Sequence, residues 1–245
     1  MNDNQKEELL KQPKEKQKAE KEQQLRVLPE MERDAIRLHE KWVETEGVEG
    51  CKMDLRGKDL SNIKLTHFNL DKAQLTEANL SGAKIYSGSF KEACLSHCNL
   101  ENVVIENTDL IKAKLDGVKG ENANFNLDEC EEASFKNAFL HKANFAYANL
   151  KKVCFAHADL SKANFEGASL DQTDFAYANL QNANLLGAKL RDANLYGADI
   201  SGAKISLRAI TLKQLEMCLF TPELAQIIQA KYNLMTIYDR CKNGE

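Results

Sequence analysis

The chain has 245 residues, of which 33 are Lys or Arg and 37 are Asp or Glu, so its formal net charge is −4. Such a chain has no strong attraction for nucleic acid, and direct nucleic-acid binding is not expected. The sequence shows no secretory signal and no apolar run long enough to cross a membrane, and its seven cysteines follow no regular spacing. These features predict a protein of the reducing cytoplasm that does not enter a membrane, with non-classical secretion as the open alternative.

The first 28 residues form a charged arm. They are rich in Lys, Glu and Gln and include Pro13, which is typical of a disordered or partly helical segment. In residues 29–50, Pro29 predicts the first turn of a helix. Apolar residues then recur at spacings of four, three and four, which predicts an apolar stripe on this helix. The stripe consists of Met31, Ala35, Leu38 and Trp42.

Residues 51–210 follow a strict period of five. From Leu55 to Ile205 almost every fifth residue is Leu, Ile or Phe, whereas Gly120 breaks the pattern and Cys130 replaces the apolar residue at one position. A small residue, usually Ala, stands two positions before most of these centres. Neither a helix nor an amphipathic strand has this period. The pattern therefore predicts a stacked repeat in which two side chains of each unit point inward.

A second period, of 20 residues, groups the aromatic centres. The six Phe residues between positions 125 and 175 fall alternately on two sets of positions spaced by 20. If one coil takes 20 residues, each set stacks as a ladder of three rings. Eight coils at the usual strand spacing of ~4.8 Å would give a rod roughly 37 Å long. We expect the inward residues to fill this rod and to leave no binding site inside it.

The repeating units resemble those of the pentapeptide-repeat family. Examples are Ala-Asn-Leu-Lys-Lys at 148–152, Ala-Asn-Phe-Glu-Gly at 163–167 and Ala-Asn-Leu-Tyr-Gly at 193–197. The resemblance covers about residues 51–205. It implies an all-β solenoid, a right-handed quadrilateral β-helix of about eight coils with four pentapeptides in each. The segment from Leu38 to Trp42, with Gly47 and Gly50, resembles the lead-in helix of many family members and implies an N-terminal helical cap.

Two places depart from the family pattern. Larger residues replace Ala in the first coil, which predicts that this coil is irregular; they are Met53, Lys58, Ile63 and Phe68. Near the middle of the repeat, Gly120 and Asp128 occupy positions that should hold an apolar and a small residue. This second departure suggests a bulge or a kink.

Residues 211–245 predict a C-terminal helical cap. Thr211 is suited to begin a short helix, and Thr221-Pro222-Glu223 is a second start signal. The apolar residues that follow exceed what a lid on a narrow rod needs. Some members of the family dimerise through this end, so the resemblance implies a possible homodimer through the C-terminal helices, with a lid alone as the alternative.

Function is then expected on the outer surface of the rod. Around Glu132, residues spaced by 20 alternate in charge, which predicts a wall that neutralises itself. Apolar and aromatic residues at other outward positions suggest a surface that binds an unknown protein partner. The candidate residues lie on two opposed faces of the rod, Leu127, Ala146 and Tyr147 on one and His157, Tyr177 and Tyr196 on the other, and the partner is expected to bind along one or both of these faces. The chain is accordingly predicted to be a non-catalytic, rigid scaffold for protein–protein interaction.

The alternative is a protein that mimics DNA. Some pentapeptide-repeat proteins resemble B-form DNA in size and charge and bind DNA gyrase. In this chain, residues 101–132 carry more acids than bases, although the repeat as a whole is nearly neutral. If the chain acts in this way, the residues required are Glu101, Glu106, Glu121, Glu131 and Glu132.

The sequence offers little support for catalysis or for a cofactor. It contains no Gly-rich phosphate loop, no nucleophile elbow and no HExxH motif. Cys94, His97 and Cys98 are spaced like metal ligands, but the repeat predicts that Cys98 points inward while the other two point outward. Because a tetrahedral site cannot gather them from opposite sides of the wall, no metal site is predicted.

Overall fold

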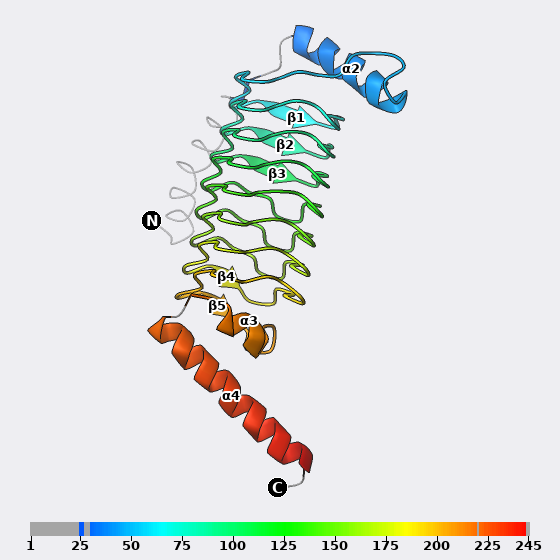
Figure 1. The fold of residues 1–245 in the computed structure, drawn as a ribbon. Helices are drawn as coiled ribbons and strands as arrows, with labels where there is room; N and C mark the ends of the chain where they lie inside the picture. Colours follow the sequence, from blue (N-terminus) through cyan, green and yellow to red (C-terminus); the bar gives the residue numbers. More distant parts are fainter. Residues whose placement is uncertain (1–24, 27–29, 220, 244–245) are drawn as a thin grey trace, which may run out of the picture.

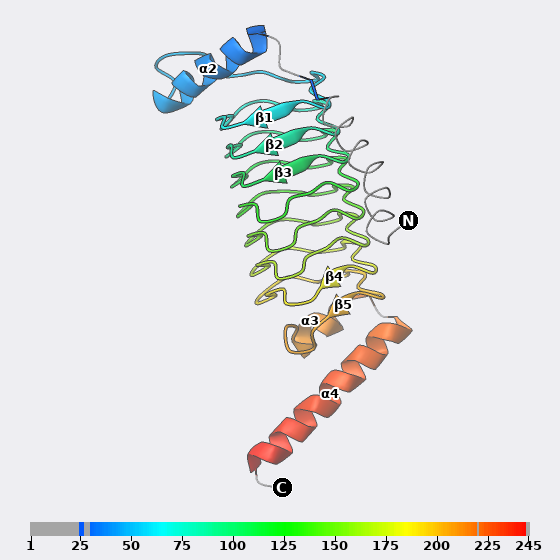
Figure 2. The same cartoon turned by 180° about the vertical axis from the view of Figure 1, so that it is seen from behind.

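The chain forms a rod of stacked coils with helices at both ends (Figure 1 and Figure 2). The computed structural model describes residues 25–26, 30–219 and 221–243. Helix α2 lies at one end of the rod, and α3 and α4 lie at the other. The elements in chain order are α2 (Glu30–Glu44), β1 (Lys64–Thr66), β2 (Lys84–Tyr86), β3 (Val104–Glu106), β4 (Asn184–Leu185), β5 (Lys204–Ile205), α3 (Leu212–Glu216) and α4 (Pro222–Asn243).

Each coil pairs in parallel with the next at a register of 20 residues. Leu65 on β1 lies opposite Ile85 on β2, and Ile85 lies opposite Ile105 on β3. Most other rungs are single-residue bridges of the same register, such as Asn144 with Asn164. The described strands have only two or three residues because the chain turns again after each pentapeptide. The predicted 20-residue stacking is confirmed, and the fold is a β-helix-type solenoid.

A tight turn follows every pentapeptide. The N–H of Ala73 donates to the carbonyl of Leu70 (3.1 Å), and this three-residue step recurs along the rod. The second residue after each centre has a positive φ, between 52° and 73°, at every fifth position from Gly57 to Gly202. Such a turn requires the left-handed conformation at its third residue. Four turns in each 20-residue coil give the rod four walls and four corners, and each corner carries the two residues that follow a centre.

The inside of the rod is a continuous apolar core. The two Phe ladders are present as predicted: Phe145 stacks on Phe125 (ring centroids 4.9 Å apart) and on Phe165 (5.3 Å). It also meets Phe135 (5.7 Å) and Phe155 (5.5 Å) of the other ladder edge to face. All six rings are fully buried. Edge-to-face contacts between two stacked ladders fill the lumen with favourable aromatic geometry.

The two predicted irregular regions differ from expectation. In the first coil only Lys58 turns outward, whereas Met53, Ile63 and Phe68 are buried. The ring of Phe68 occupies the space of the next coil's small residue, because a Cβ built on Gly88 would lie 2.2 Å from it. The suggested bulge or kink near Gly120 is wrong. Its N–H pairs with the carbonyl of Phe139 (2.7 Å), and the 20-residue register continues without a break.

Helix α2 contacts the first coil through part of the predicted stripe: Ala35 packs on the core, and half-buried Trp42 stacks on the buried His39 (ring centroids 5.6 Å apart). Met31 and Leu38 of the predicted stripe are 85% and 49% exposed. Beside Ala35, the helix packs on the core through Ile36 and the fully buried His39. The prediction is wrong for Met31 and Leu38, because apolar periodicity counts histidine as a polar residue, whereas His39 belongs to the buried face and shifts it away from these two residues.

His39 and Glu40 pair with backbone groups at the edge of the rod. Nδ1 of His39 accepts the N–H of Met53 (3.0 Å), so its Nε2 carries the proton and donates to the carbonyl of Asp71 (2.9 Å). Burial lowers the pKa of His39, which favours this neutral form. Oε1 of Glu40 accepts the N–H of Asn69 (3.1 Å). The two side chains thus satisfy groups that a preceding coil would otherwise pair.

The charged arm reaches this edge in its described part. The N–H of Arg26 donates to the carbonyl of Asn62 (2.8 Å), and its guanidinium forms an ion pair with Asp59 (2.9 Å). The predictions for residues 1–24, 27 and 28 lie outside the described residues. Arg26 therefore places one point of the arm along an edge that would otherwise expose unpaired backbone groups.

At the opposite end, α3 and α4 begin as the sequence predicts. Thr211 and Gln214 form a capping box at the start of α3, and Thr221 accepts the N–H of Leu224 (3.2 Å) at the start of α4. Nε2 of the buried Gln214 donates to the carbonyls of Leu190 (2.8 Å) and Ala193 (3.0 Å). One side-chain amide therefore takes the place of a further coil at this edge.

We expect Gln214→Ala to destabilise the rod by about 1–3 kcal/mol, because the buried carbonyl of Ala193 loses its side-chain donor, while the carbonyl of Leu190 keeps the N–H of Ala193 (3.1 Å). The free energy of unfolding in urea measures this loss. Gln229→Ala is the matched control, since Gln229 is exposed on α4 and bonds only to Asn233 (3.1 Å). Equal losses in the two variants would contradict the assigned role.

Candidate interaction surfaces

The predicted partner residues lie at two opposite corners of the rod. Leu127 and Tyr147 occupy the same corner in successive coils, and each is 58% exposed. We call this corner the Tyr147 corner. His157, Tyr177 and Tyr196 lie half a coil away, and we call theirs the aromatic corner. Ala146 is buried, with 7% of its surface exposed. The six predicted residues thus form two separate surfaces.

The side chain of Tyr147 packs against the next coil along the chain, at Glu166 and Gly167. A Cβ built on Gly167 would lie 2.5 Å from the tyrosine ring, so the ring lies over bare backbone. Its hydroxyl donates to Glu166 (3.5 Å). Glycine is required at 167 by the close approach of this ring; the positive φ of Gly167 (66°) is shared by non-glycine residues at the same turn position, such as Tyr147 (58°). The ring is therefore packed on one side and exposed on the other.

The aromatic corner carries three rings in contact. His157 stacks on Tyr177 with centroids 5.1 Å apart, and Tyr177 meets Tyr196 edge to face at 5.4 Å. The loss of hydration and the contact with Tyr196 raise the pKa of Tyr177. Tyr177 and Tyr196 nevertheless remain 53% and 52% exposed. This is a fixed, solvent-facing aromatic cluster, a composition that is enriched at protein interfaces.

Phe139 is an exposed aromatic residue that the sequence analysis missed. It is 60% exposed and lies in the middle of a wall, paired with Lys119 on one side and Asp159 on the other. The candidate residues predicted from the sequence all lie one or two positions after a centre, whereas Phe139 immediately precedes one. Comparison of this position at the 20-residue spacing would have found it, because its neighbours in the column are polar.

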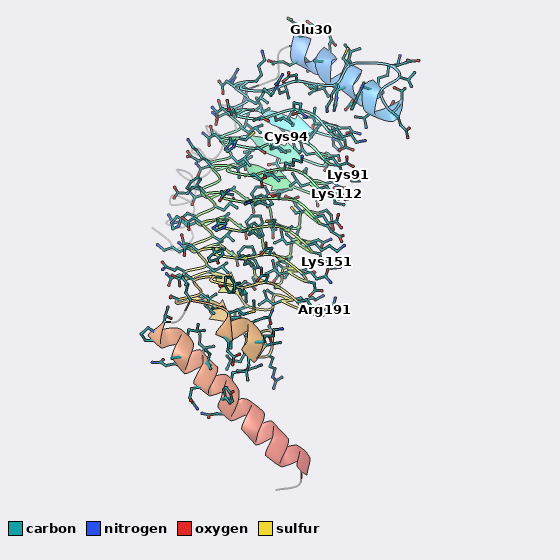
Figure 3. All side chains as sticks on the ribbon, in the orientation of Figure 1. Glu30, Lys91, Cys94, Lys112, Lys151 and Arg191 are labelled. Atoms are coloured by element: carbon teal, nitrogen blue, oxygen red, sulfur yellow. The ribbon has the colours of Figure 1, made fainter. Side chains whose placement is uncertain are left out.

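A third corner neutralises its own charges, as predicted. Lys91, Lys112, Lys151 and Arg191 lie along one side of the rod (Figure 3). We call it the charged corner. Its ion pairs are Lys112 with Glu132 (3.7 Å), Lys152 with Glu132 (2.9 Å) and with Glu131 (4.0 Å), and Arg191 with Asp171 (3.2 Å).

The five acids of the DNA-mimic hypothesis are spread over three corners. Glu101 and Glu121 share one corner, Glu106 belongs to the Tyr147 corner, and Glu131 and Glu132 belong to the charged corner. Glu121 is also paired with Lys142 (3.4 Å). Three of the five carboxylates are therefore opposed by lysine within the rod.

The cysteines and histidine that are spaced like metal ligands point to opposite sides of the wall. The thiol of Cys98 is buried and donates to the carbonyl of Leu75 (2.8 Å), and burial raises its pKa to about 12. Cys94 lies on the outside beside Thr76 (3.3 Å), and the ring of His97 covers Gly117. Within the described ranges, no group of three or more His, Cys, Asp or Glu side chains is arranged to hold a metal ion.

Comparison with solved structures identifies the fold. HetL, a pentapeptide repeat protein involved in heterocyst differentiation regulation from Nostoc sp. strain PCC 7120, is 28% identical over 64% of this chain and 76% of its own, with a TM-score of 0.38. A trypsin-treated form of QnrB1, a plasmid-mediated fluoroquinolone resistance protein, is 17% identical over 75% of this chain and 98% of its own, with a TM-score of 0.54. No curated protein matches the chain.

Among the described residues, none of the helices combines the length and hydropathy needed to cross a membrane.

Two family models cover most of the repeat. One describes pentapeptide repeats in eight copies and matches residues 54–87 and 89–126, and the other describes a pentapeptide repeat region and matches residues 138–217. Together with the five-residue turns and the 20-residue register, these matches show that the chain belongs to the pentapeptide-repeat family.

Proposed function

We propose that this protein is a non-catalytic, rigid scaffold of the cytoplasm that binds other proteins through the corners of its rod. In this proposal the rod is a right-handed, quadrilateral β-helix of about eight coils, and the terminal helices act as caps. The supporting observation is that large aromatic side chains are exposed at fixed corner positions although any polar residue would fit there. The filled lumen supports an outer site, because the six central rings have no exposed surface.

The proposal predicts that single aspartate substitutions at the two corners separate two binding surfaces. The full-length wild type, Tyr147→Asp and Tyr177→Asp are used to capture proteins from native lysate, with identification by mass spectrometry. A partner lost from one variant locates the binding corner, because a buried carboxylate at an apolar contact opposes association. Gln172→Asp is the matched control, since Gln172 is exposed at the same turn position with a φ of 60°.

Retention of every partner by both tyrosine variants would count against the scaffold proposal. DNA gyrase retained by both would instead favour the second candidate, a DNA-mimicking binder of gyrase. That candidate is supported by Glu101 and Glu106, for which the described residues supply no cation within 4.0 Å. Gyrase binding through carboxylates should weaken steeply with added salt, whereas binding through aromatic residues should be much less sensitive.

A second copy of the chain is the third kind of partner that we propose, at helix α4. The first turns of this 22-residue helix pack on the core of the rod through Leu224, Ile227 and Ile228. Beyond them, α4 runs away from the coils (Figure 2). Sedimentation of the wild-type protein, run as a control for the capture experiment, shows whether it self-associates.

A further inference from the structure

Carboxylates flank the aromatic corner on both sides. Asp174 lies two residues before Ala176 at this corner, and Asp159 lies two residues after His157. Asp159 pairs with Asn179 in the next coil, and Asn179 pairs with Asp199 in the coil after that, so Asp159 and Asp199 belong to one column of stacked residues. All three carboxylates face outward at half-exposed positions. The exposed rings therefore lie between two columns that carry negative charge.

Neutral amides hold these carboxylates in place. Asn194 donates to Asp174 (2.8 Å), Asn179 donates to Asp159 (3.1 Å) and Gln181 donates to Asp199 (2.6 Å); the donors are side-chain amides in each case. In the described part of the chain, no Lys or Arg nitrogen lies within 4.0 Å of any of the three carboxylates. The amides fix the carboxylate positions without neutralising their charge.

The charged corner provides the contrast within the same rod. There Asp171 faces Arg191 (3.2 Å) and Glu132 faces two lysines, so its charges are already opposed. At the aromatic corner the charges of Asp159, Asp174 and Asp199 are not opposed by a described lysine or arginine, so these carboxylates can pair with a cation of a binding partner. Exposed rings attract cations through their faces, and a planar guanidinium can stack on a ring while it forms paired hydrogen bonds with a carboxylate. A lysine ammonium lacks that planar fork.

We propose that the aromatic corner binds an arginine-containing basic segment of a partner protein. The rings of Tyr177 and Tyr196 contact the guanidinium groups, and Asp159 and Asp199 accept their hydrogen bonds. Exposed Phe139, which pairs with Asp159 along the wall, extends the apolar contact by one coil. This proposal rests on the scaffold function and specifies the chemistry of one of its partners.

Fluorescence anisotropy with labelled peptides tests the proposal. The probes are a fluorescein-labelled hexapeptide of alternating arginine and glycine and its lysine counterpart. We expect the full-length protein to bind the arginine peptide more tightly. The double variant Tyr177→Ala/Tyr196→Ala should weaken this binding by about ten-fold, because two cation–π contacts are lost. Tyr147→Ala, at the opposite and equally exposed corner, should leave it unchanged.

A second variant separates binding from folding. Asp159→Asn/Asp199→Asn removes two charges and keeps the acceptor oxygens, and asparagine already occupies the intervening position 179 of the same column. It should fold as the wild type does by thermal unfolding and still weaken the arginine peptide several-fold. If neither peptide binds, or if Tyr147→Ala weakens binding as much as the double tyrosine variant does, the proposal is wrong.

The failure of this proposal can be distinguished from the failure of the scaffold function. A partner captured from lysate by the wild type and lost only from Tyr147→Asp would keep the scaffold function and overturn the assignment of the aromatic corner. Equal binding of the arginine and lysine peptides would also overturn it, because a simple charge attraction would then explain the affinity.

Discussion

Replacing Asp128 with asparagine should stabilise the rod, and the gain should be largest above pH 7. Asp128 is fully buried at a position where the three following coils hold alanine, at 148, 168 and 188. Its Oδ1 accepts the N–H of Thr108 (2.9 Å), but its Oδ2 has no hydrogen-bond partner among the described residues. Burial is the main cause that raises the pKa of this carboxyl to about 7; the N–H of Thr108 opposes the rise, and the nearby carboxylates of Glu106 and Glu129 add to it.

The direction of the pH dependence follows from the two pKa values. The pKa of Asp128 is raised from 3.8 to about 7 by folding, so the folded chain binds more protons between these values. The stability of the wild type should therefore fall as the pH rises from about 4 to about 7, by on the order of 4 kcal/mol. Above pH 7 the full penalty is present, and below pH 4 it is absent.

Asparagine suits this position for a structural reason. Two other inward polar residues donate to the carbonyl found 23 residues earlier: Cys98 to Leu75 and Thr173 to Leu150, each at 2.8 Å. The equivalent carbonyl for position 128 is that of Ile105, so a side-chain amide gains a partner while keeping the acceptor for Thr108. The carboxylate at this position has no proton to donate above pH 7.

Urea unfolding of the wild type and Asp128→Asn at pH 4.5 and pH 8 checks this prediction. The difference in unfolding free energy should reach a few kcal/mol at pH 8 and shrink towards pH 4.5. Asp192→Asn is the control, because Asp192 is exposed at a corner. A stability difference that does not change with pH would show that the charge of Asp128 is not the cause.

The second large effect is expected for Phe145→Ala, which should lower the free energy of unfolding by about 3–5 kcal/mol. Phe145 is fully buried and touches four other rings, so its removal leaves a cavity at the meeting point of both ladders. Phe145→Leu should lose less than about 1.5 kcal/mol, because leucine occupies the same wall position at 185.

Phe139→Ala is the matched control for this loss. Phe139 is also a phenylalanine and lies six residues away, but it is 60% exposed and makes no ring contact with the residues that the structure describes. We expect a change within about 0.5 kcal/mol, as for other exposed substitutions. Similar losses for the two alanine variants in urea unfolding would contradict the assignment of Phe145 to the core.

The repeat and its interior were predictable from the sequence because they depend on short-range order. A fixed period of five determines where the chain turns, and the coincidence of Phe residues at a spacing of 20 determines which coils stack. Both periods can be counted along the chain. The charge alternation of the third corner, including the Lys112–Glu132–Lys152 set, follows from the same counting.

The ends of the rod were harder to predict because nothing repeats there. The buried face of α2 contains His39, whose role depends on two backbone groups supplied by Met53 and Asp71, residues distant in sequence. The role of Gln214 likewise depends on carbonyls more than 20 residues earlier. Such a side chain bonds to backbone groups at the end of the rod. Its role can be recognised only when the positions of those backbone groups are known.

The solenoid, its 20-residue coil and the inward-facing residues can be derived from the amino-acid sequence, because close packing of a narrow lumen allows few side chains at each position. The contacts that outward residues make with one another required the three-dimensional structure. The structure added Phe139 to the exposed aromatic residues. It also showed that no Lys or Arg among the described residues pairs with Asp159, Asp174 or Asp199, whereas Glu132 and Asp171 of the charged corner are paired with lysine or arginine. Outward side chains are not constrained by packing, so their neighbours become known only when the coils are placed side by side.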